Sequence, residues 1–166
     1  MTLGADERLA IHELLALHGH VVDDGELDRL DELVTEDVVY DASRLGHGEL
    51  RGLEAFRDMA RARAGAAHGP VGHHVTNIVL TEAGDGRVHA RSKGIGVAVD
   101  GGCGTVTFED EIVRSEGGWR IGRRRIVPHG VPGGEAPYAA RPHVDPPGTH
   151  RSDRSHLPSS PEVSST

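Results

Sequence analysis

Residues 72–80 read Gly-His-His-Val-Thr-Asn-Ile-Val-Leu, and this stretch is the most informative part of the chain. Its β-branched and apolar residues predict a strand, whose side chains alternate between two faces. Strict alternation places His73 and Asn77 on one face and His74 on the other. Whichever face is interior therefore carries an imidazole, which titrates near neutral pH and can act as acid or base. The competing interpretation is a half-exposed histidine pair at a sheet edge, bonded to the backbone.

The composition fits one soluble domain. With 166 residues, of which 36% are hydrophobic, the chain is long enough for a single core. Its net charge of −8 and 3% aromatic content argue against nucleic-acid binding. We find no apolar run of about 18 residues and no leader-like start, so we expect a cytoplasmic protein that does not bind membranes. A single cysteine, Cys103, allows no intramolecular disulfide and no thiolate metal site.

The chain divides into a folded body, residues 1–130, and a tail, residues 131–166. The tail is rich in Pro, Gly, Ser and His and shows no periodic apolar pattern. Such a composition buries too little apolar surface to offset the entropy of ordering. We therefore predict that the tail is mostly disordered.

Within the body, helical patterns come first and strand patterns follow. Apolar residues at helical spacing predict a first helix over about 5–22, ended by Asp23-Asp24-Gly25 with Gly25 as a left-handed cap. Glycine-rich turns separate the later strands, as in hairpins. This order indicates an α+β fold in which helices close over a curved antiparallel sheet. The other predicted elements are a short helix at 27–34, a strand at 37–43, a helix from 52, and strands at 71–81, 87–100, 104–115 and 118–128.

Two polar residues interrupt the apolar faces of these elements. His18 lies among the apolar residues of the first helix, and Asp110 shares a strand face with Phe108 and Ile112. A lone histidine on such a face is more often a satisfied core residue, whereas a buried carboxylate needs a partner or a cavity. Asp23 follows His18 by five residues, so both could meet His73 if the sheet wraps around the helix.

Six motifs follow one another along the body of the chain. They are His-Gly-His-Val-Val-Asp-Asp-Gly-Glu-Leu-Asp-Arg-Leu at 18–30, Glu-Asp-Val-Val-Tyr-Asp at 36–41, Gly-Leu-Glu-Ala-Phe at 52–56, the His-His-Val-Thr-Asn strand, Phe-Glu-Asp at 108–110 and Gly-Gly-Trp-Arg-Ile at 117–121. This ordered set resembles the SnoaL-like proteins, which belong to the superfamily named after nuclear transport factor 2, with scytalone dehydratase and ketosteroid isomerase. The resemblance spans residues 5–129 and implies a cone-shaped, cystatin-like α+β barrel whose curved, mixed sheet wraps around the N-terminal helices, with a pocket between them.

The resemblance also implies roles for individual residues. Asp23 and His73 match the aspartate and the general-base histidine of the dehydratases, and Ala98 stands near the position of their second histidine. Phe108 stands near the position of the pocket asparagine of scytalone dehydratase, so the substrate must differ. The expected catalytic residues are Asp23, His73, Tyr40 and Asp110, and the expected substrate-binding residues are His18, Asn77, Phe56 and Phe108.

These groups support proton transfer without a cofactor or metal. An aspartate orients the imidazole that takes a proton, and a tyrosine or a protonated acid stabilises the enolate. We therefore expect a lyase or cyclase, catalysing dehydration or intramolecular cyclisation of a small, partly apolar secondary metabolite such as a polyketide. The likeness to the family also implies a homodimer formed through the open sheet face.

Other functions stay open at this point. An epoxide hydrolase on this fold would use Asp23, Asp110 and an inward arginine, Arg91 or Arg123. A ketosteroid-type isomerase would use the same proton-transfer groups, and a non-catalytic binding or assembly module would use none of them. His18, His73 and Asp23 would form a two-histidine, one-carboxylate metal set, which we consider the least favoured alternative.

Limited proteolysis tests the division into body and tail. Because disordered termini are cut first, protease should remove residues beyond about 135 and leave a body that unfolds as cooperatively as the full chain. Mass spectrometry of the fragments and their thermal unfolding provide the measurement. A trimmed body that has lost its cooperative transition would show that the tail belongs to the fold.

Overall fold

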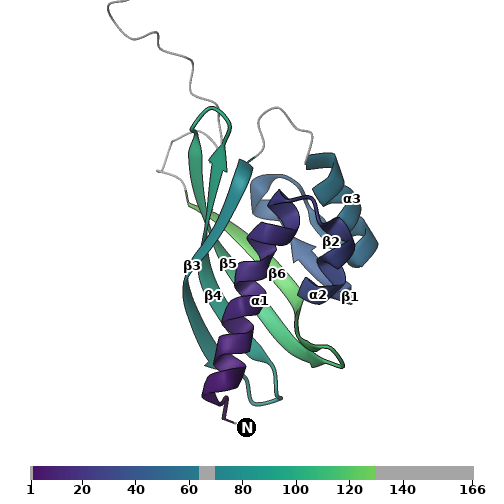
Figure 1. Cartoon of the computed structure of the whole chain (residues 1–166), viewed down its shortest axis with the longest axis vertical. Coiled ribbons are helices and arrows are strands. Elements are labelled where there is room, and N and C mark those ends of the chain that lie inside the picture. The colour runs from purple at the N-terminus through teal and green to yellow at the C-terminus, as the bar shows by residue number, and fades with distance from the viewer. Residues whose placement is uncertain (1, 64–69, 130–166) are drawn as a thin grey trace, which may run out of the picture.

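The structure, a computed structural model, describes residues 2–63 and 70–129 (Figure 1). The tail predicted for 131–166 lies outside these residues. Within them the helical half comes first and the strand half follows, as the sequence predicts. The elements are α1 (Ala5–Asp23), η1 (Leu27–Arg29), α2 (Leu30–Leu33), β1 (Val34–Asp41), η2 (Ser43–Leu45), β2 (Glu49–Arg51), α3 (Leu53–Arg63), β3 (Pro70–Glu82), β4 (Val88–Ala98), β5 (Cys103–Ser115) and β6 (Gly118–His129).

The strands form one mixed sheet in the order β2-β1-β6-β5-β4-β3. The last four strands are the antiparallel meander that the hairpin signals predict. Strand β1 joins this meander in parallel with β6, and the short β2 pairs antiparallel with β1. The β2 strand has three residues and was not predicted, because so short a run carries no detectable alternation.

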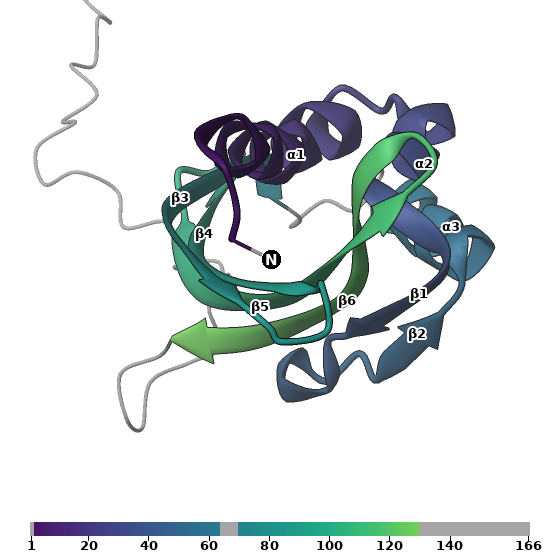
Figure 2. The same cartoon turned by 90° about the horizontal axis from the view of Figure 1, so that it is seen from below.

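The sheet curls around α1, and the helices lie on its concave side (Figure 2). Helix α1 packs against β3, and α3 packs against β1. This arrangement confirms the predicted α+β cone of cystatin-like type. Among the residues that the structure describes, no helix is both long and apolar enough to cross a membrane.

Helix α1 follows the predicted pattern closely. Its buried face carries Ile11, Leu14, Leu15 and His18, all at helical spacing. The Glu7 carboxylate accepts the Gly4 N–H at 3.0 Å, which satisfies one free donor at the start of the helix. After Asp23 the chain turns through Gly25, whose φ of 72° is the left-handed conformation predicted from the sequence. The helix therefore ends with Asp23 held at the edge of the sheet.

A bulge in β3 corrects the predicted alternation. The register with β4 shifts between Thr76 and Val79, and Asn77 adopts a φ of 53°. One extra residue on β3 reverses the parity of the strand beyond this point. Val75 and Ile78 therefore both pack against the core, while Asn77 is exposed. The expectation that Asn77 shares a face with His73 was wrong.

A second bulge lies in β6 at Gly122, where the register with β5 shifts. Before the bulge the buried residues are Trp119 and Ile121, and after it they are Arg124 and Ile126. Because the parity changes here, Arg123 points to the outer face and Arg124 to the interior. Strict alternation from Ile121 along β6 predicts that Arg124 points outward, so it gave no reason to expect this arginine in the interior.

The inward Arg124 forms a buried ion pair with Asp110. Its Nε and Nη2 donate to the two carboxylate oxygens at 2.8 Å each, and the side chains are 2% and 0% exposed. The guanidinium also lies 4.3 Å from the centre of the Phe108 ring. A buried carboxylate is costly unless it is paired, so Arg124 explains why Asp110 is tolerated on an apolar strand face.

Candidate active site

Asp23 and His73 form the central contact of the site. The His73 backbone N–H donates to Asp23 Oδ2 at 2.6 Å, and the ring Nδ1 lies 2.5 Å from Oδ1. An ionised carboxylate can only accept hydrogen bonds, so Nδ1 carries the proton in the neutral imidazole. The other ring nitrogen, Nε2, then has a free lone pair. This is the arrangement of a general base oriented by a carboxylate.

Gly19 permits this contact. A Cβ placed on Gly19 would lie 2.4 Å from the His73 carbonyl oxygen, which is closer than real Cβ atoms approach backbone oxygen. The missing side chain lets α1 touch the backbone of β3 one helical turn before Asp23. The carboxylate can therefore reach His73 from the end of the same helix.

The dyad borders a pocket of about 170 Å³ between α1, β1, α3 and the start of β3. Tyr40 and Phe56 stack in its wall, with ring centres 4.6 Å apart. Five predicted site residues meet here, and apolar side chains supply most of the remaining wall. The described lining residues are His18, Val22, Asp23, Tyr40, Phe56, Met59, Ala60, Arg63, Pro70, Val71 and His73.

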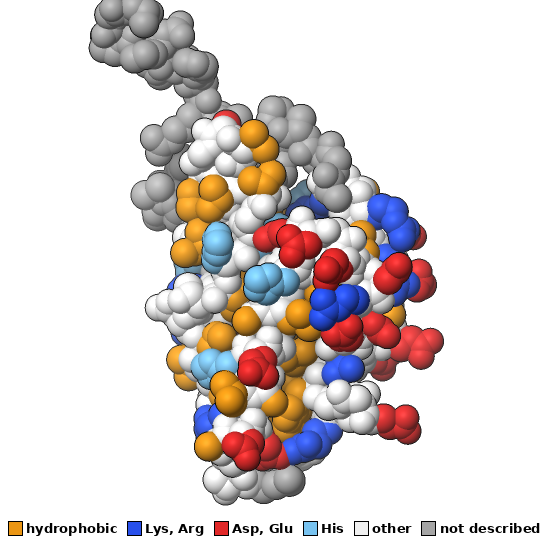
Figure 3. Space-filling model, in the orientation of Figure 1, with side chains coloured by type: hydrophobic (Ala, Val, Ile, Leu, Met, Phe, Trp, Pro, Cys, Tyr) orange, Lys and Arg blue, Asp and Glu red, His pale blue; other side chains and the backbone are white. Residues whose placement is uncertain are grey.

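The end of the molecule beside this pocket is apolar. Val71 is 58% exposed and Val99 is 78% exposed, and Pro70 of β3 pairs with Ala98 at the end of β4. Figure 3 shows hydrophobic side chains gathered at this end, whereas acidic and basic side chains gather over α2 and α3. A largely uncharged molecule would therefore meet apolar surface where β3 begins.

His18 is the buried wall of the pocket. Its ring is edge-on to His73, with centres 5.7 Å apart, and 3% of the residue is exposed. Burial, the charge of Arg124 and the nearby His73 lower the pKa of His18 well below its ordinary value of 6.5. His18 is therefore a neutral imidazole at neutral pH. Its Nδ1 has no hydrogen-bond partner among the described residues.

Asp110 does not line this pocket, because both of its oxygens are held by Arg124. Burial alone would lower the pKa of Arg124, but the Asp110 carboxylate outweighs it and the pKa lies above its ordinary value. Both Asp110 oxygens are therefore occupied, and this side chain is no free base. The arginines expected for an epoxide hydrolase also lie elsewhere, since Arg91 is exposed and Arg123 bonds Glu49 on the outer face.

Two predicted binding residues lie outside the pocket. Phe108 is buried one layer behind it, against the His18 ring at 5.8 Å. Asn77 is exposed and accepts a hydrogen bond from Thr76, on the far side of the β3 bulge. Within residues 2–63 and 70–129, no three His, Cys, Asp or Glu side chains are placed to hold a metal ion. The His18, His73 and Asp23 set therefore does not form a metal site.

Sequence reasoning missed Arg124, Gly19 and the remaining lining residues of the pocket, which are Val22, Met59, Ala60, Arg63, Pro70 and Val71. The signal for Arg124 was the odd spacing of Ile121 and Ile126, which can both face the core only if an extra residue such as Gly122 lies between them. Nothing in the sequence marked Gly19, because its role depends on a strand more than fifty residues away.

The fold and the site define a small α+β cone that carries an Asp–His acid–base pair. A family model for the SnoaL-like domain matches residues 4–125. The chain belongs to this SnoaL-like family, whose fold is shared by dehydratases, cyclases and isomerases.

Solved structures agree on the fold. An NTF2-like protein with a cystatin-like fold from Novosphingobium aromaticivorans is 26% identical, with a TM-score of 0.61 over 73% of this chain and 80% of that one. A protein of the same organism, provisionally named a scytalone dehydratase, is 19% identical, with a TM-score of 0.64 over 83% and 94% of the two chains. Aln2 from a Streptomyces species is 21% identical, with a TM-score of 0.64 over 77% and 94%. No curated protein matches the chain.

Replacing Gly19 with alanine tests how the dyad is positioned. The added Cβ would meet the His73 carbonyl, so α1 and β3 must separate and the Asp23–His73 contact must lengthen. We expect Gly19→Ala to lower the free energy of unfolding by about 1–3 kcal/mol, as overpacking does, and to change the NMR chemical shifts of the His73 ring. Gly72→Ala is the matched control, since its Cβ would meet nothing closer than 3.5 Å. Equal behaviour of the two variants would contradict this role for Gly19.

Proposed function

We propose that the protein is a cofactor-independent lyase or cyclase that works by acid–base proton transfer on a small, largely apolar molecule. The observation that carries this proposal is the Asp23–His73 contact beside an apolar pocket. The Asp23 carboxylate fixes the tautomer and the orientation of the imidazole, and it stabilises the imidazolium that forms when Nε2 takes a proton.

The proposed reaction begins at a carbon next to a carbonyl group. His73 Nε2 removes the proton, and the electron pair moves onto the carbonyl oxygen as an enolate. Tyr40 or the neutral His18, which line the pocket, can donate a hydrogen bond to this oxygen. In a dehydration the enolate returns its electrons to form a carbon–carbon double bond, and the β-hydroxyl leaves as water with the proton from His73. In a cyclisation the enolate carbon attacks a second carbonyl carbon of the same molecule, and the alkoxide that forms takes the proton back from His73.

The volume of the pocket limits the substrate. An engineered protein cavity of about 150 Å³ holds one benzene molecule, and the pocket here measures about 170 Å³. The enclosed part therefore suits a single six-membered ring. A polyketide of several rings would extend outward past Val71, so we propose a one-ring substrate or one ring of a larger secondary metabolite.

The same dyad suits an isomerase of the ketosteroid type, in which the proton returns to a different carbon. The epoxide-hydrolase alternative is less favoured, because the inward arginine is Arg124, which holds both oxygens of Asp110, and neither residue lines the pocket. Arg91 is exposed and Arg123 pairs with Glu49 on the outer face. A binding module would keep the pocket but would not require the carboxylate to engage the His73 ring. The dyad geometry thus favours proton transfer.

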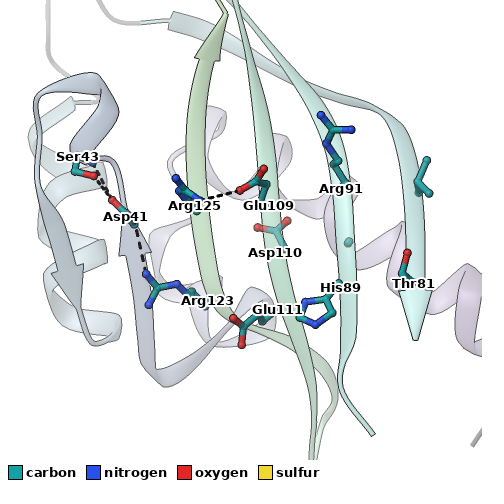
Figure 4. A pocket seen from close by; sticks show the side chains of 12 residues that line it. Asp41, Ser43, Thr81, His89, Arg91, Glu109, Asp110, Glu111, Arg123 and Arg125 are labelled. Atoms are coloured by element: carbon teal, nitrogen blue, oxygen red, sulfur yellow. Dashed lines mark hydrogen bonds and ion pairs between the residues drawn. The ribbon is translucent and has the colours of Figure 1, made fainter. Parts of the chain in front are cut away.

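We also propose that a second copy of this chain covers the outer face of the sheet. Helices α1, α2 and α3 lie on the opposite, concave side, and this face has a hollow of about 670 Å³ whose lining includes Ser43 of η2 (Figure 4). Arg123 and Arg125 of β6 stand beside Glu109 and Glu111 of β5. A two-fold interface sets the same patch against itself, so neighbouring rows of opposite charge can pair across it.

Sedimentation analysis tests this second copy. The wild-type chain should sediment as a dimer at micromolar concentration. Arg123→Glu with Arg125→Glu makes the β5 and β6 rows of this face both acidic and should produce a monomer. Arg61→Glu on α3, whose side chain is 62% exposed, is the control and should remain dimeric. A monomeric wild-type chain would contradict the proposal.

The catalytic prediction separates the two adjacent histidines. His73→Ala removes the proposed base and Asp23→Asn removes the orienting charge, so each should lose about 10²–10⁴ in rate while folding normally. His74 is exposed, and His74→Ala should keep its activity. Dehydration of single-ring β-hydroxy ketones such as 3-hydroxycyclohexanone, followed by the absorbance of the enone, provides the measurement.

Two results would change this assignment. If His74→Ala lost activity while His73→Ala kept it, the base would be His74 and the proposed assignment of His73 would be wrong. Equal activity of both variants would remove histidine from the reaction altogether.

A further inference from the structure

The face of α3 that lines the pocket ends in an arginine. The lining residues of this helix are Phe56, Met59, Ala60 and Arg63, and they follow the i, i+3, i+4, i+7 spacing of a single helix face. Three of them are apolar, and the last carries a positive charge. Because helix side chains lean toward the N-terminal end, the Arg63 side chain is directed back along this face, toward the pocket.

Arg63 lies at the outer end of the pocket. At the inner end His18 is 3% exposed and Phe56 is 2% exposed, whereas Arg63 and Val71 are exposed residues. The pocket therefore opens to solvent between the end of α3 and the start of β3. A helix rises about 1.5 Å per residue, which places the Arg63 backbone roughly 10 Å beyond Phe56 along the axis. A ligand whose ring fills the inner end can reach the guanidinium with a short substituent.

The other two arginines of α3 have acidic partners, and Arg63 has none. Arg57 pairs with Glu54, and Arg61 pairs with Asp58, each three residues earlier on the helix. Three residues before Arg63 the helix has an alanine. Within residues 2–63 and 70–129 no hydrogen bond or ion pair engages the Arg63 side chain, so these residues leave its guanidinium available to an anionic ligand.

The positive charge of Arg63 is the charge of the lining that remains for a ligand. The described lining residues include one carboxylate, Asp23, and one guanidinium, Arg63. Both Asp23 oxygens are bonded to His73. A basic residue in the last turn of a helix also interacts favourably with the helix dipole, but Arg61 of the same turn does so without lining the pocket. The dipole thus explains a cation at this end of α3 but not its place on the pocket face.

We propose that Arg63 determines specificity by binding a carboxylate on a short substituent of the ligand's ring, so that the substrate class is single-ring acids. The ring fills the apolar inner part of the pocket. The carboxylate lies at the mouth, where it keeps part of its hydration and gains charge-assisted hydrogen bonds from the guanidinium. This inference rests on the proposed function, in which the pocket binds one small ring, and it does not depend on which proton-transfer reaction follows.

NMR titration with two matched ligands tests the inference. Phenylacetate and phenylacetamide have nearly the same shape and differ in charge. The amide shifts of Val71 and His73 report binding in the pocket, and their saturation gives each affinity. Wild type should prefer the acid, and Arg63→Gln should weaken phenylacetate about fivefold or more, as loss of a charge-assisted hydrogen bond does. The affinity for phenylacetamide should change less than about twofold, because no charge pair is lost.

Arg61→Gln is the matched control for this titration. It removes the same charge from the same helical turn, and the Arg61 side chain is 62% exposed and does not line the pocket. Both affinities should stay at the wild-type values in this variant. An equal loss of phenylacetate affinity in Arg61→Gln would show a general effect of charge on α3 and would overturn the inference.

Three further results would overturn the role of Arg63. They are an unchanged ratio of the two affinities in folded Arg63→Gln, equal binding of the two probes by wild type, and a folded wild type whose pocket binds neither probe. Failure of the proposed reaction is seen in a different measurement, namely wild-type dehydration activity in His73→Ala. In that case the preference for phenylacetate and its loss in Arg63→Gln would still establish the acid site.

Discussion

The contact between the Asp23 carboxylate and His73 joins the helical half of the molecule to the sheet. One oxygen holds the backbone of β3 and the other holds the imidazole, so a single side chain fixes both the strand and the base. Gly19 makes this possible by letting α1 approach the strand backbone. The orientation of the histidine is therefore set by the packing of the fold, and any change that separates α1 from β3 must also alter the acid–base chemistry of His73.

The interior distributes charge so that His18 stays neutral. The chain carries a net charge of −8, yet the group at its centre is a cation, Arg124, whose charge is balanced by Asp110. The same cation, together with burial, lowers the pKa of His18. Because Arg124 is buried and does not line the pocket, the pocket keeps the electrostatic effect of the arginine on His18 without exposing the charge to a ligand.

Sequence patterns predicted the helices, the strands other than β2 and the antiparallel meander, because these depend on local periodicity. The pairing of Asp23 with His73, fifty residues apart, was expected from the family resemblance and not from spacing along one element. The sequence patterns failed at Asn77 and Arg124 for one physical reason. Each residue lies in or just after a β-bulge, and the extra residue of a bulge exchanges the inward and outward faces of the strand beyond it. Both exchanges of face could be inferred from the spacing of apolar residues. Val75 and Ile78, and likewise Ile121 and Ile126, are an odd number of positions apart, so each pair can share one strand face only across a bulge. Sequence patterns could not predict the parallel pairing of β1 with β6 or the role of Gly19, because both depend on contacts between segments far apart in the chain.

The bulge at Asn77 gives β3 two separate alternations in one strand. Residues before it present His73 to the pocket, and residues after it present Ile78 and Leu80 to the core. If all residues stayed but the bulge straightened into regular strand, keeping Ile78 and Leu80 in the core would turn His74 toward Asp23 and His73 outward. Which histidine meets the carboxylate is thus decided by the backbone conformation at Asn77, so a change that removes the bulge acts on the chemistry as directly as a side-chain substitution does.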